Sequence, residues 1–250
     1  AMTKKAAALA NLELGAMDPK IADAIMAACD QIIAGEGHEF FVVDMLQGGA
    51  GTSTNMNANE VIANMALRRI GKPRGDYASI NPNDHVNLSQ STNDVYPTAV
   101  RLTILRDCPS LLDSQIALKA AFLKKAAEFD HIIKVGRTQL MDAVPMRLGS
   151  EFRAFGVTVG EDVDRLKEFA NLLREVNLGG TAIGTGINTP GDYPATVIRH
   201  LSKVSGVDLV TAGDLIEATS DMGAFVTFSG VLKRIAVKLS KICNDLRLLN

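Results

Sequence analysis

The sequence contains no tryptophan, only three cysteines and no long run of apolar residues. Cys29, Cys108 and Cys243 are far apart and match no metal-binding or redox spacing, which favours reduced thiols in a cytoplasmic protein. No stretch approaches the ~20 apolar residues that a membrane-spanning helix needs, and residues 1–14 lack the apolar core of a signal peptide. We therefore expect a cytoplasmic protein without disulfides or a membrane span.

An excess of charge of either sign is also missing. The 26 Lys and Arg residues nearly balance the 28 Asp and Glu residues, and the net charge is −2. This balance favours neither nucleic acid nor an anionic membrane as a partner. Aromatic residues make up only 5% of the chain, whereas Ala, Leu, Lys and Glu are plentiful, which favours helices. A chain of 250 residues can form one large globular domain or two small ones.

The most informative segment that is present is polar and runs from Asn81 to Val100. Its first part, NPNDHVNLSQSTND, contains only Val86 and Leu88 as large apolar residues. Asp94 and Pro97 then indicate the start of a helix. Ser91, Thr92 and Asn93 should therefore lie at a helix N-terminus, where backbone N–H groups and the helix dipole favour an anion. We hypothesise a carboxylate-binding site; the alternative is an ordinary helix cap beside a polar loop.

A second polar cluster, QGGAGTSTNMNAN at 47–59, also precedes a predicted helix. Its glycines allow tight turns or a close approach to a ligand, and Thr52 and its neighbours supply uncharged donors. No Gly-Lys-Ser/Thr follows, so the segment is not a nucleotide-binding P-loop. Two clusters of the same kind make a shared anion site more plausible than either does alone.

The remaining sequence predicts helices joined by glycine-rich or proline-containing loops. Residues 39–46 are equally compatible with a helix and a strand, residues 131–145 favour a loop or extended turn, and 177–190 favour a Gly/Thr loop. Within the 131–145 segment, Arg137 is expected to form a salt bridge inside the loop, next to the donors Thr138 and Gln139. The expected helices cover residues 4–14, 19–34, 60–70, 94–106, 109–130, 149–176, 192–204 and 214–250.

The final segment, 214–250, has the most regular pattern. Its apolar residues alternate spacings of three and four, which is typical of a heptad seam. A helix of this length would extend ~50 Å and would need several helical neighbours. We expect some of these neighbours to come from other subunits; the alternative is a monomeric bundle covered by the short helices. The change to long helices near residue 93 is the best domain boundary. The seam consists of Phe225, Phe228, Leu232, Ile235, Leu239, Ile242, Leu246 and Leu249.

Together the polar loops resemble the fumarase/aspartase superfamily of lyases, along essentially the whole chain. The matching motifs are GGAGTSTNMNANE at 48–60, NPNDHVNLSQSTND at 81–94, GRTQLMDAVPMRLGSEF at 136–152 and GGTAIGTGINTP at 179–190. The resemblance implies an all-α, long-helix bundle fold that assembles into a homotetramer around the central helices. It also implies an N-terminal helical domain over 1–92, which would be incomplete, and a truncated central bundle domain over 93–250.

The resemblance further implies the reaction and the site. It is closest to the branch that deaminates L-aspartate reversibly to fumarate and ammonia, through an aci-carboxylate intermediate. The alternatives are a fumarase or another dicarboxylate lyase, or an inactive fragment that serves only as a helical assembly module. The implied active sites combine loops from three subunits. The residues that the resemblance places on the dicarboxylate are Thr52, Ser91, Thr92, Asn93, Thr138 and Gln139.

Two features depart from the family pattern. Many members, fumarases among them, have His where Gln139 stands, so Gln139 favours the aspartate branch. Gln cannot relay a proton, so we expect no acid role at this position. The family's serine base lies in a G-S-S loop, which this sequence lacks. We therefore expect the base beyond Asn250, no catalytic residue within these 250 residues, and little activity from them alone. No metal or other cofactor is expected, although activation by Mg²⁺ is left open.

Overall fold

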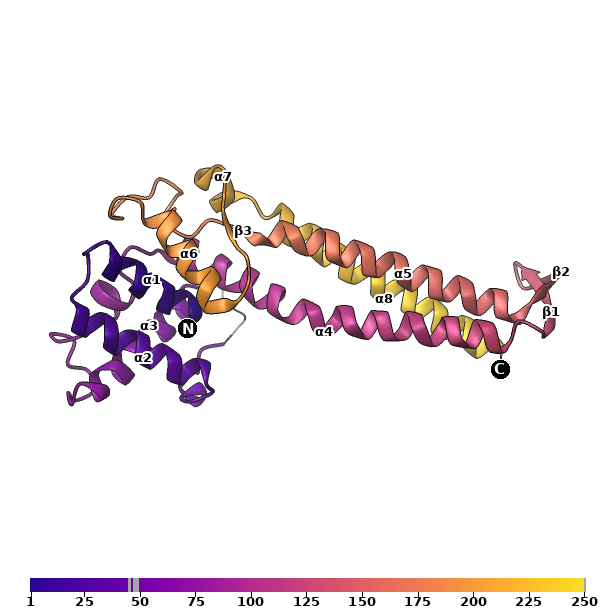
Figure 1. The fold of residues 1–250 in the computed structure, drawn as a ribbon, viewed down its shortest axis with the longest axis horizontal. Coiled ribbons are helices and arrows are strands. Elements are labelled where there is room, and N and C mark those ends of the chain that lie inside the picture. The colour runs from indigo at the N-terminus through magenta and orange to yellow at the C-terminus, as the bar shows by residue number, and fades with distance from the viewer. Residues whose placement is uncertain (45, 47–49, 250) are drawn as a thin grey trace. The chain divides into compact units, whose positions relative to one another are not determined.

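A computed structural model describes residues 1–44, 46 and 50–249, and Figure 1 shows its course. Helices account for most of the described residues, which confirms the all-α class. Four short strands accompany them: β1 (Ile133–Thr138), β2 (Met141–Arg147), β3 (Glu175–Val176) and β4 (Val210–Thr211). The helices are α1 (Met2–Glu13), α2 (Pro19–Ile33), α3 (Thr52–Arg69), α4 (Thr92–Glu128), α5 (Leu148–Asn171), α6 (Tyr193–Ser205), α7 (Leu215–Ser220) and α8 (Gly223–Leu249).

The chain forms two compact units, and α4 contributes to both. The first unit combines residues 1–106 with 173–222, and the second combines 107–172 with 223–250. The segment that contains α6 thus packs with the N-terminal helices although it follows α5 in sequence. The predicted domain boundary near residue 93 is a different division of the chain and stays a prediction.

The first unit is built on two apolar clusters. Helices α2 and α3 share one cluster, which includes Ile25, Ile62 and Leu67. Helix α1 packs against α6 in the other, around Tyr193 and Leu201. The predicted start of α2 is confirmed. Asp18 is the N-cap and accepts hydrogen bonds from the backbone N–H groups of residues 20 and 21, and Pro19 is the first residue of the helix.

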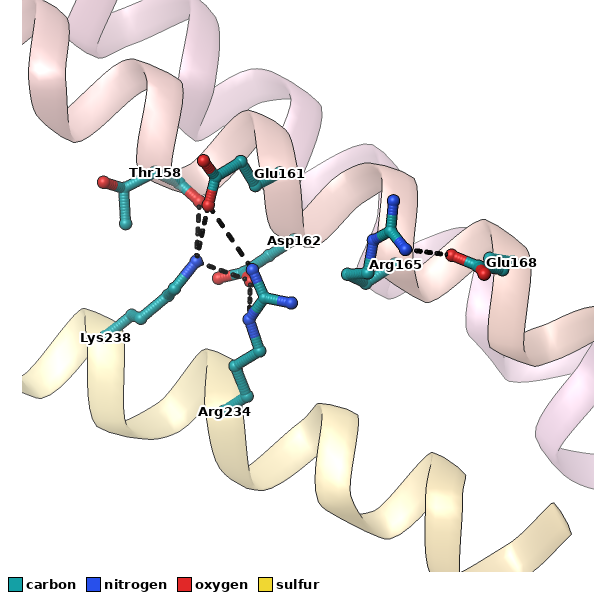
Figure 2. Close-up of polar contacts among 7 residues, drawn as sticks. All are labelled: Thr158, Glu161, Asp162, Arg165, Glu168, Arg234 and Lys238. Carbon is teal, nitrogen blue, oxygen red and sulfur yellow. Dashed lines mark hydrogen bonds and ion pairs between the residues drawn. The ribbon is translucent and has the colours of Figure 1, made fainter.

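The second unit is a set of long helices that pack through phenylalanines. Phe122 of α4 contacts Phe152 and Phe155 of α5, with ring centroids 6.4 and 5.6 Å apart. Ile242 of α8 completes the buried cluster. In Figure 2, Lys238 and Arg234 of α8 reach Asp162 of α5, each at 3.0 Å. The Asp162 side chain is only 3% exposed, so this carboxylate lies in the contact between α5 and α8.

Several predicted helix boundaries are wrong. The helices expected at 94–106 and 109–130 are one continuous helix, α4. Pro109 removes a backbone hydrogen bond but has a helix-compatible φ, so it costs stability without forcing an end. Conversely, the helix expected over 214–250 is divided, because Asp221 is extended (φ −82°, ψ 129°) between α7 and α8. The segment 149–176 also ends its α-helix early, at Asn171, and continues as a 3₁₀ turn, η3 (Leu172–Arg174).

Residues 131–145, expected as a loop or extended turn, instead form part of an antiparallel hairpin. Strands β1 and β2 pair from Ile133 opposite Arg147 to Thr138 opposite Met141, with an irregularity between Gly136 and Arg137. The β-branched residues of this segment favour a strand. The register of the pairing shifts directly after Gly136, a residue type that is common at such irregularities. The predicted salt bridge of Arg137 is confirmed: its Nε lies 3.5 Å from Asp142.

Several predictions concern residues at the edges of the described part. The second polar cluster begins with residues 47–49, which lie outside the described residues. The heptad position at Leu249 lies outside the described side chains. The ambiguous 39–46 segment begins with a 3₁₀ turn, η1 (His38–Phe40), and the described residues beyond it form neither helix nor strand. Over the residues that the structure describes, we find no helix with the length and apolar character required to cross a membrane.

Candidate functional site

The predicted helix start at 91–94 is a reciprocal cap on α4. The Ser91 hydroxyl oxygen accepts the backbone N–H of Asn93 at 3.2 Å, and the Ser91 N–H donates to Asp94 Oδ1 at 2.9 Å. Each end of the Ser-x-x-Asp segment therefore satisfies a backbone group of the first turn. The cap fixes the backbone of Ser91, Thr92 and Asn93 at the positive end of the helix dipole.

Asp94 also anchors a distant loop. Its second oxygen, Oδ2, accepts the backbone N–H groups of Gly179 and Thr181 at 3.0 and 2.9 Å. Gly179 has φ +100°, and a Cβ there would lie 2.8 Å from Pro194 Cα, so a side chain would be both strained and crowded. The Gly/Thr loop predicted at 177–190 is thus bonded to the α4 N-terminus through Asp94.

Asn93 is the exposed member of the triplet. Its Nδ2 donates to the Ala182 carbonyl at 2.7 Å, and Asn177 Nδ2 donates to the Asn93 carbonyl at 3.0 Å. Asn177 also donates to Thr219 Oγ1 at 3.1 Å. The Asn93 amide is therefore oriented by the same loop that Asp94 anchors, while one of its two N–H groups remains for another acceptor.

Thr92 lies deeper, and it connects the two predicted polar clusters. It is only 9% exposed, and its Oγ1 accepts a hydrogen bond from Asn55 Nδ2 of α3 at 3.0 Å. The first turns of α3 and α4 also touch: Gly51, with φ +88°, would place a Cβ 2.4 Å from the Tyr96 ring. Because Thr52 follows Gly51 as the first residue of α3, the structure brings Thr52 and the 91–93 triplet into the same region of the first unit.

A buried lysine and a buried carboxylate set the electrostatics of this region. Lys4 is 3% exposed and donates to Asn87 Oδ1 at 2.8 Å. Burial lowers the pKa of Lys4 to about 7, although the negative charge of Asp94 opposes this change. Burial raises the pKa of Asp94 to about 6, while the three backbone N–H groups and Lys4 pull it down. The region thus contains one basic and one acidic group that the protein buries almost completely.

Thr138 and Gln139 lie at the end of the β1–β2 hairpin, in the second compact unit. Both are exposed, and Gln139 has φ +51°, which suits a turn residue that points outward. The structure therefore groups Thr52, Ser91, Thr92 and Asn93 within the first unit, whereas Thr138 and Gln139 belong to the other. Convergence of all six residues stays a prediction.

Two hollows of the first unit lie near the candidate residues, but neither has Ser91, Thr92 or Asn93 among its lining residues. One, of about 630 Å³, lies around Gln31, Met65 and Arg68. The other, of about 340 Å³, lies around Lys4, Asn55 and Tyr96. The candidate site is therefore the polar patch formed by Thr52 and the 91–93 triplet, defined by its hydrogen bonds and not by either hollow.

Sequence reasoning missed the residues that support this patch. Lys4 and Asn11 are both buried in α1. They are seven residues apart, which is two helical turns, and this spacing in an Ala-rich helix could have indicated that both lie on its buried face. Asn87 carried no comparable signal. His85 contributes to the loop, because its Nδ1 accepts the backbone N–H of Asn81 at 2.8 Å. Within the described residues there is no cluster of three His, Cys, Asp or Glu residues that could hold a metal ion.

Known proteins are similar to this chain along its whole length. A family model described as lyase matches residues 1–250. The aspartate ammonia-lyase of Pseudomonas fluorescens is 62% identical over 251 residues, which cover 100% of this chain and 52% of that protein. The aspartate ammonia-lyase of Escherichia coli (strain K12) is 54% identical over 250 residues, which cover 100% of this chain and 52% of that protein. This chain thus spans about half the length of these relatives.

Solved structures show the same likeness in three dimensions. The fumarate lyase:delta crystallin from Brucella melitensis bound to cobalt has a TM-score of 0.97 at 61% identity, and the match covers 99% of this chain and 54% of that one. The class II fumarase from Schistosoma mansoni has a TM-score of 0.93 at 33% identity, covering 98% of this chain and 54% of that one. The fold described above is therefore shared with structures of both kinds.

Proposed function

Because the chain belongs to the lyase family whose model matches it from residue 1 to residue 250, we propose that the complete protein deaminates L-aspartate reversibly to fumarate and ammonia. The similarity to aspartate ammonia-lyases at 54–62% identity supports this choice of substrate. Gln139 supports it as well, since many family members that act on other dicarboxylates are expected to have His there.

One observation carries the chemical argument: the Thr92 hydroxyl is held at a capped helix N-terminus, next to Asn93 and in the same region as Thr52. These groups are uncharged donors fixed by the protein. A carboxylate of the substrate can accept from them, and the donors need not reorganise when more charge develops on it. We assign Thr52, Ser91, Thr92, Asn93, Thr138 and Gln139 to substrate binding and charge stabilisation.

The reaction requires such donors. A base removes a proton from the carbon next to the β-carboxylate, and the resulting aci-carboxylate carries two negative charges. The electron pair then forms the C=C bond of fumarate while the C–N bond breaks and ammonia leaves. Each preorganised donor to the aci-carboxylate is worth ~3 kcal/mol, by analogy with oxyanion holes. We place the base outside these 250 residues, in the serine loop that the family resemblance implies, and we propose that no cofactor is needed.

We also propose that the complete protein is a cytoplasmic homotetramer with active sites shared between subunits. The long helices of the second unit support this, because they carry exposed apolar side chains such as Val157, Val226 and Val237, at 54, 68 and 60% exposure. Large exposed apolar side chains on one unit are typical of a surface that another subunit covers. The three cysteines are free thiols, which suits the cytoplasm.

The interface proposal is tested with Val237→Asp in the complete gene product. A charge buried against another subunit is costly, so we expect the tetramer to dissociate into smaller species, as measured by light scattering. Ser229→Asp, at an exposed position of the same helix, is the matched control and should remain tetrameric. A tetrameric Val237→Asp protein would mean that this face is covered by other parts of the same polypeptide.

The activity is tested by incubating the complete gene product with L-aspartate and, separately, with L-malate, and following the absorbance of fumarate. We expect fumarate from L-aspartate. Production from L-malate alone would contradict the proposal and favour a fumarase, the alternative suggested by the fold shared with the class II fumarase. The 250 residues alone should release little ammonia; a normal rate from them would contradict the position proposed for the base.

A further inference from the structure

We propose that Asn55 is a positioning residue which, held by Asn87 and Lys4, fixes the Thr92 hydroxyl as a hydrogen-bond donor toward the substrate. This inference rests on the proposed function and adds to it a set of residues that do not touch the substrate. It follows from the order of donors and acceptors along one chain of contacts in the first unit.

The chain of contacts begins at Asn87, whose amide orientation is fixed from both ends. Its Oδ1 lies 2.8 Å from Lys4 Nζ, and an amine offers N–H donors in either charge state. Its Nδ2 lies 3.3 Å from the Gln90 carbonyl oxygen, which can only accept. An exchange of the two amide atoms would place donor against donor at one end and acceptor against acceptor at the other. The oxygen of Asn87 must therefore face Lys4.

The orientation of Asn55 follows from that of Asn87. Asn87 Oδ1 also lies 3.2 Å from Asn55 Nδ2, so the group that Asn55 presents to it must be the N–H donor. Asn59 Nδ2 donates to the same oxygen at 3.2 Å. The other N–H of the Asn55 amide then points to Thr92 Oγ1 at 3.0 Å. Both donors of Asn55 are thus used, one on each neighbour.

Thr92 is consequently left with one role. Its oxygen accepts from Asn55, and among the described residues its hydroxyl proton is donated to no acceptor. Thr92 keeps an exposed fraction of 9%, and we infer that its unused proton is the one a ligand accepts. Without Asn55 the hydroxyl could rotate and accept or donate in several directions, and its alignment toward the substrate would have to be restored on binding.

A double-mutant cycle in the complete gene product tests the inference. We expect Thr92→Val to lower kcat/KM for L-aspartate about 100-fold, as for loss of one oxyanion donor. Asn55→Ala should lower it about 10-fold in the Thr92 background, mainly through kcat, because the hydrogen bond strengthens as charge develops. In the Thr92→Val background the same substitution should change kcat/KM less than about 2-fold, since Asn55 then has no hydroxyl to orient.

Asn57→Ala is the matched control on the same helix. Asn57 also makes two hydrogen bonds, to the Phe40 carbonyl and from the Val42 N–H, each at 3.1 Å, but no link to Thr92. We expect its kcat/KM to stay within about 2-fold of the wild type. Asn55→Ser serves as a smaller change if Asn55→Ala does not fold, with the thermal midpoint recorded for every variant.

The outcomes separate the inference from the function beneath it. One outcome is that the wild type turns over L-aspartate while the fold-losses in kcat/KM of Asn55→Ala and Thr92→Val simply multiply in the double variant. In that case Asn55 acts independently of the Thr92 hydroxyl, and the inference is wrong. If the wild type turns over no dicarboxylate, the proposed function fails, and the inference fails with it. A coupled cycle with an unaffected Asn57→Ala protein supports both.

Discussion

The two compact units differ in how many polar side chains they bury. The first unit buries a connected set that includes Lys4, Asn55 and Asp94, whereas the described buried polar residues of the second are Gln115 and Asp162. Both units expose apolar side chains, and in the second unit these lie along the long helices, for example Val226 and Val237. Buried polar groups must be hydrogen-bonded in one arrangement, while apolar faces need only a complementary cover.

The difference bears on the shared active site that we propose. In the first unit, Asp94 alone accepts three backbone N–H groups from two segments, so the α4 N-terminus cannot shift without breaking several bonds. Such a network preorganises donors for a charged intermediate. In the described part of the second unit, Asp162 is the one buried carboxylate between α5 and α8, and it pairs with Arg234 and Lys238. In the function that we propose, the first unit would supply the fixed donors and the second would supply the contacts between subunits.

The largest expected effect is on catalysis, at Thr92. Thr92→Val keeps the shape of the side chain but removes the hydroxyl, and the loss of ~3 kcal/mol of transition-state stabilisation should appear in kcat/KM for L-aspartate. Thr103→Val is the control, because Thr103 lies on the same helix and donates only to the Ala99 carbonyl. Equal activity of the two variants would mean that the 91–93 triplet is merely a helix cap.

A comparably large effect concerns pH and Asp94. Its folded pKa of about 6 exceeds the ordinary 3.8, so between these values the folded state binds more protons than the unfolded state. The free energy of unfolding contributed by Asp94 is therefore present below about pH 4 and is lost as the pH rises through about 6. The loss is on the order of 3 kcal/mol.

Chemical denaturation of the wild type and of Asp94→Asn at several pH values measures this contribution. The stability of the wild type relative to the variant should decrease from about pH 4 to about pH 7, because the amide that replaces the carboxyl group does not titrate. A difference that grows over this range would show that the three N–H donors outweigh burial and hold the pKa of Asp94 low.

A smaller effect is expected in the second unit, at Asp162. Asp162→Ala leaves Lys238 and Arg234 without their buried partner, but both cations are partly exposed (24 and 38%), so we expect a loss of about 2 kcal/mol in unfolding free energy. Glu161→Ala, which removes a carboxylate that is 59% exposed from the same two cations, should cost less than about 0.5 kcal/mol. Similar losses for the two variants, in urea titrations, would remove the special role of Asp162.

The smallest effect is predicted for the neighbouring pair of Arg165 and Glu168, which Figure 2 shows along α5. Their side chains are 45 and 53% exposed, and exposed pairs at this spacing contribute roughly 0.3 kcal/mol. Arg165→Ala should thus be indistinguishable from the wild type in unfolding free energy. A loss above about 1 kcal/mol would indicate that Arg165 is covered by another part of the protein.

Local signals were sufficient for some of this structure. The Asp18-Pro19 cap and the helix start at Ser91 depend on residues within one turn of each other, and both could be predicted. Pro109 and the 131–145 segment were misjudged, because packing and strand pairing override a local preference. The second bond of Asp94, to a loop 85 residues away, has no local signature at all. The helix start at Ser91 was thus predictable, but the hydrogen-bond network around it was not.

A crystal structure of the complete gene product with bound succinate, a diacid that cannot undergo elimination, tests the central claim most directly. We predict a carboxylate oxygen within about 3.2 Å of Thr92 Oγ1. The same ligand should lie in reach of Thr52 and Asn93 and of a Thr138 from a neighbouring subunit. A succinate that binds elsewhere, or at this place only through lysine and arginine side chains, would contradict the account.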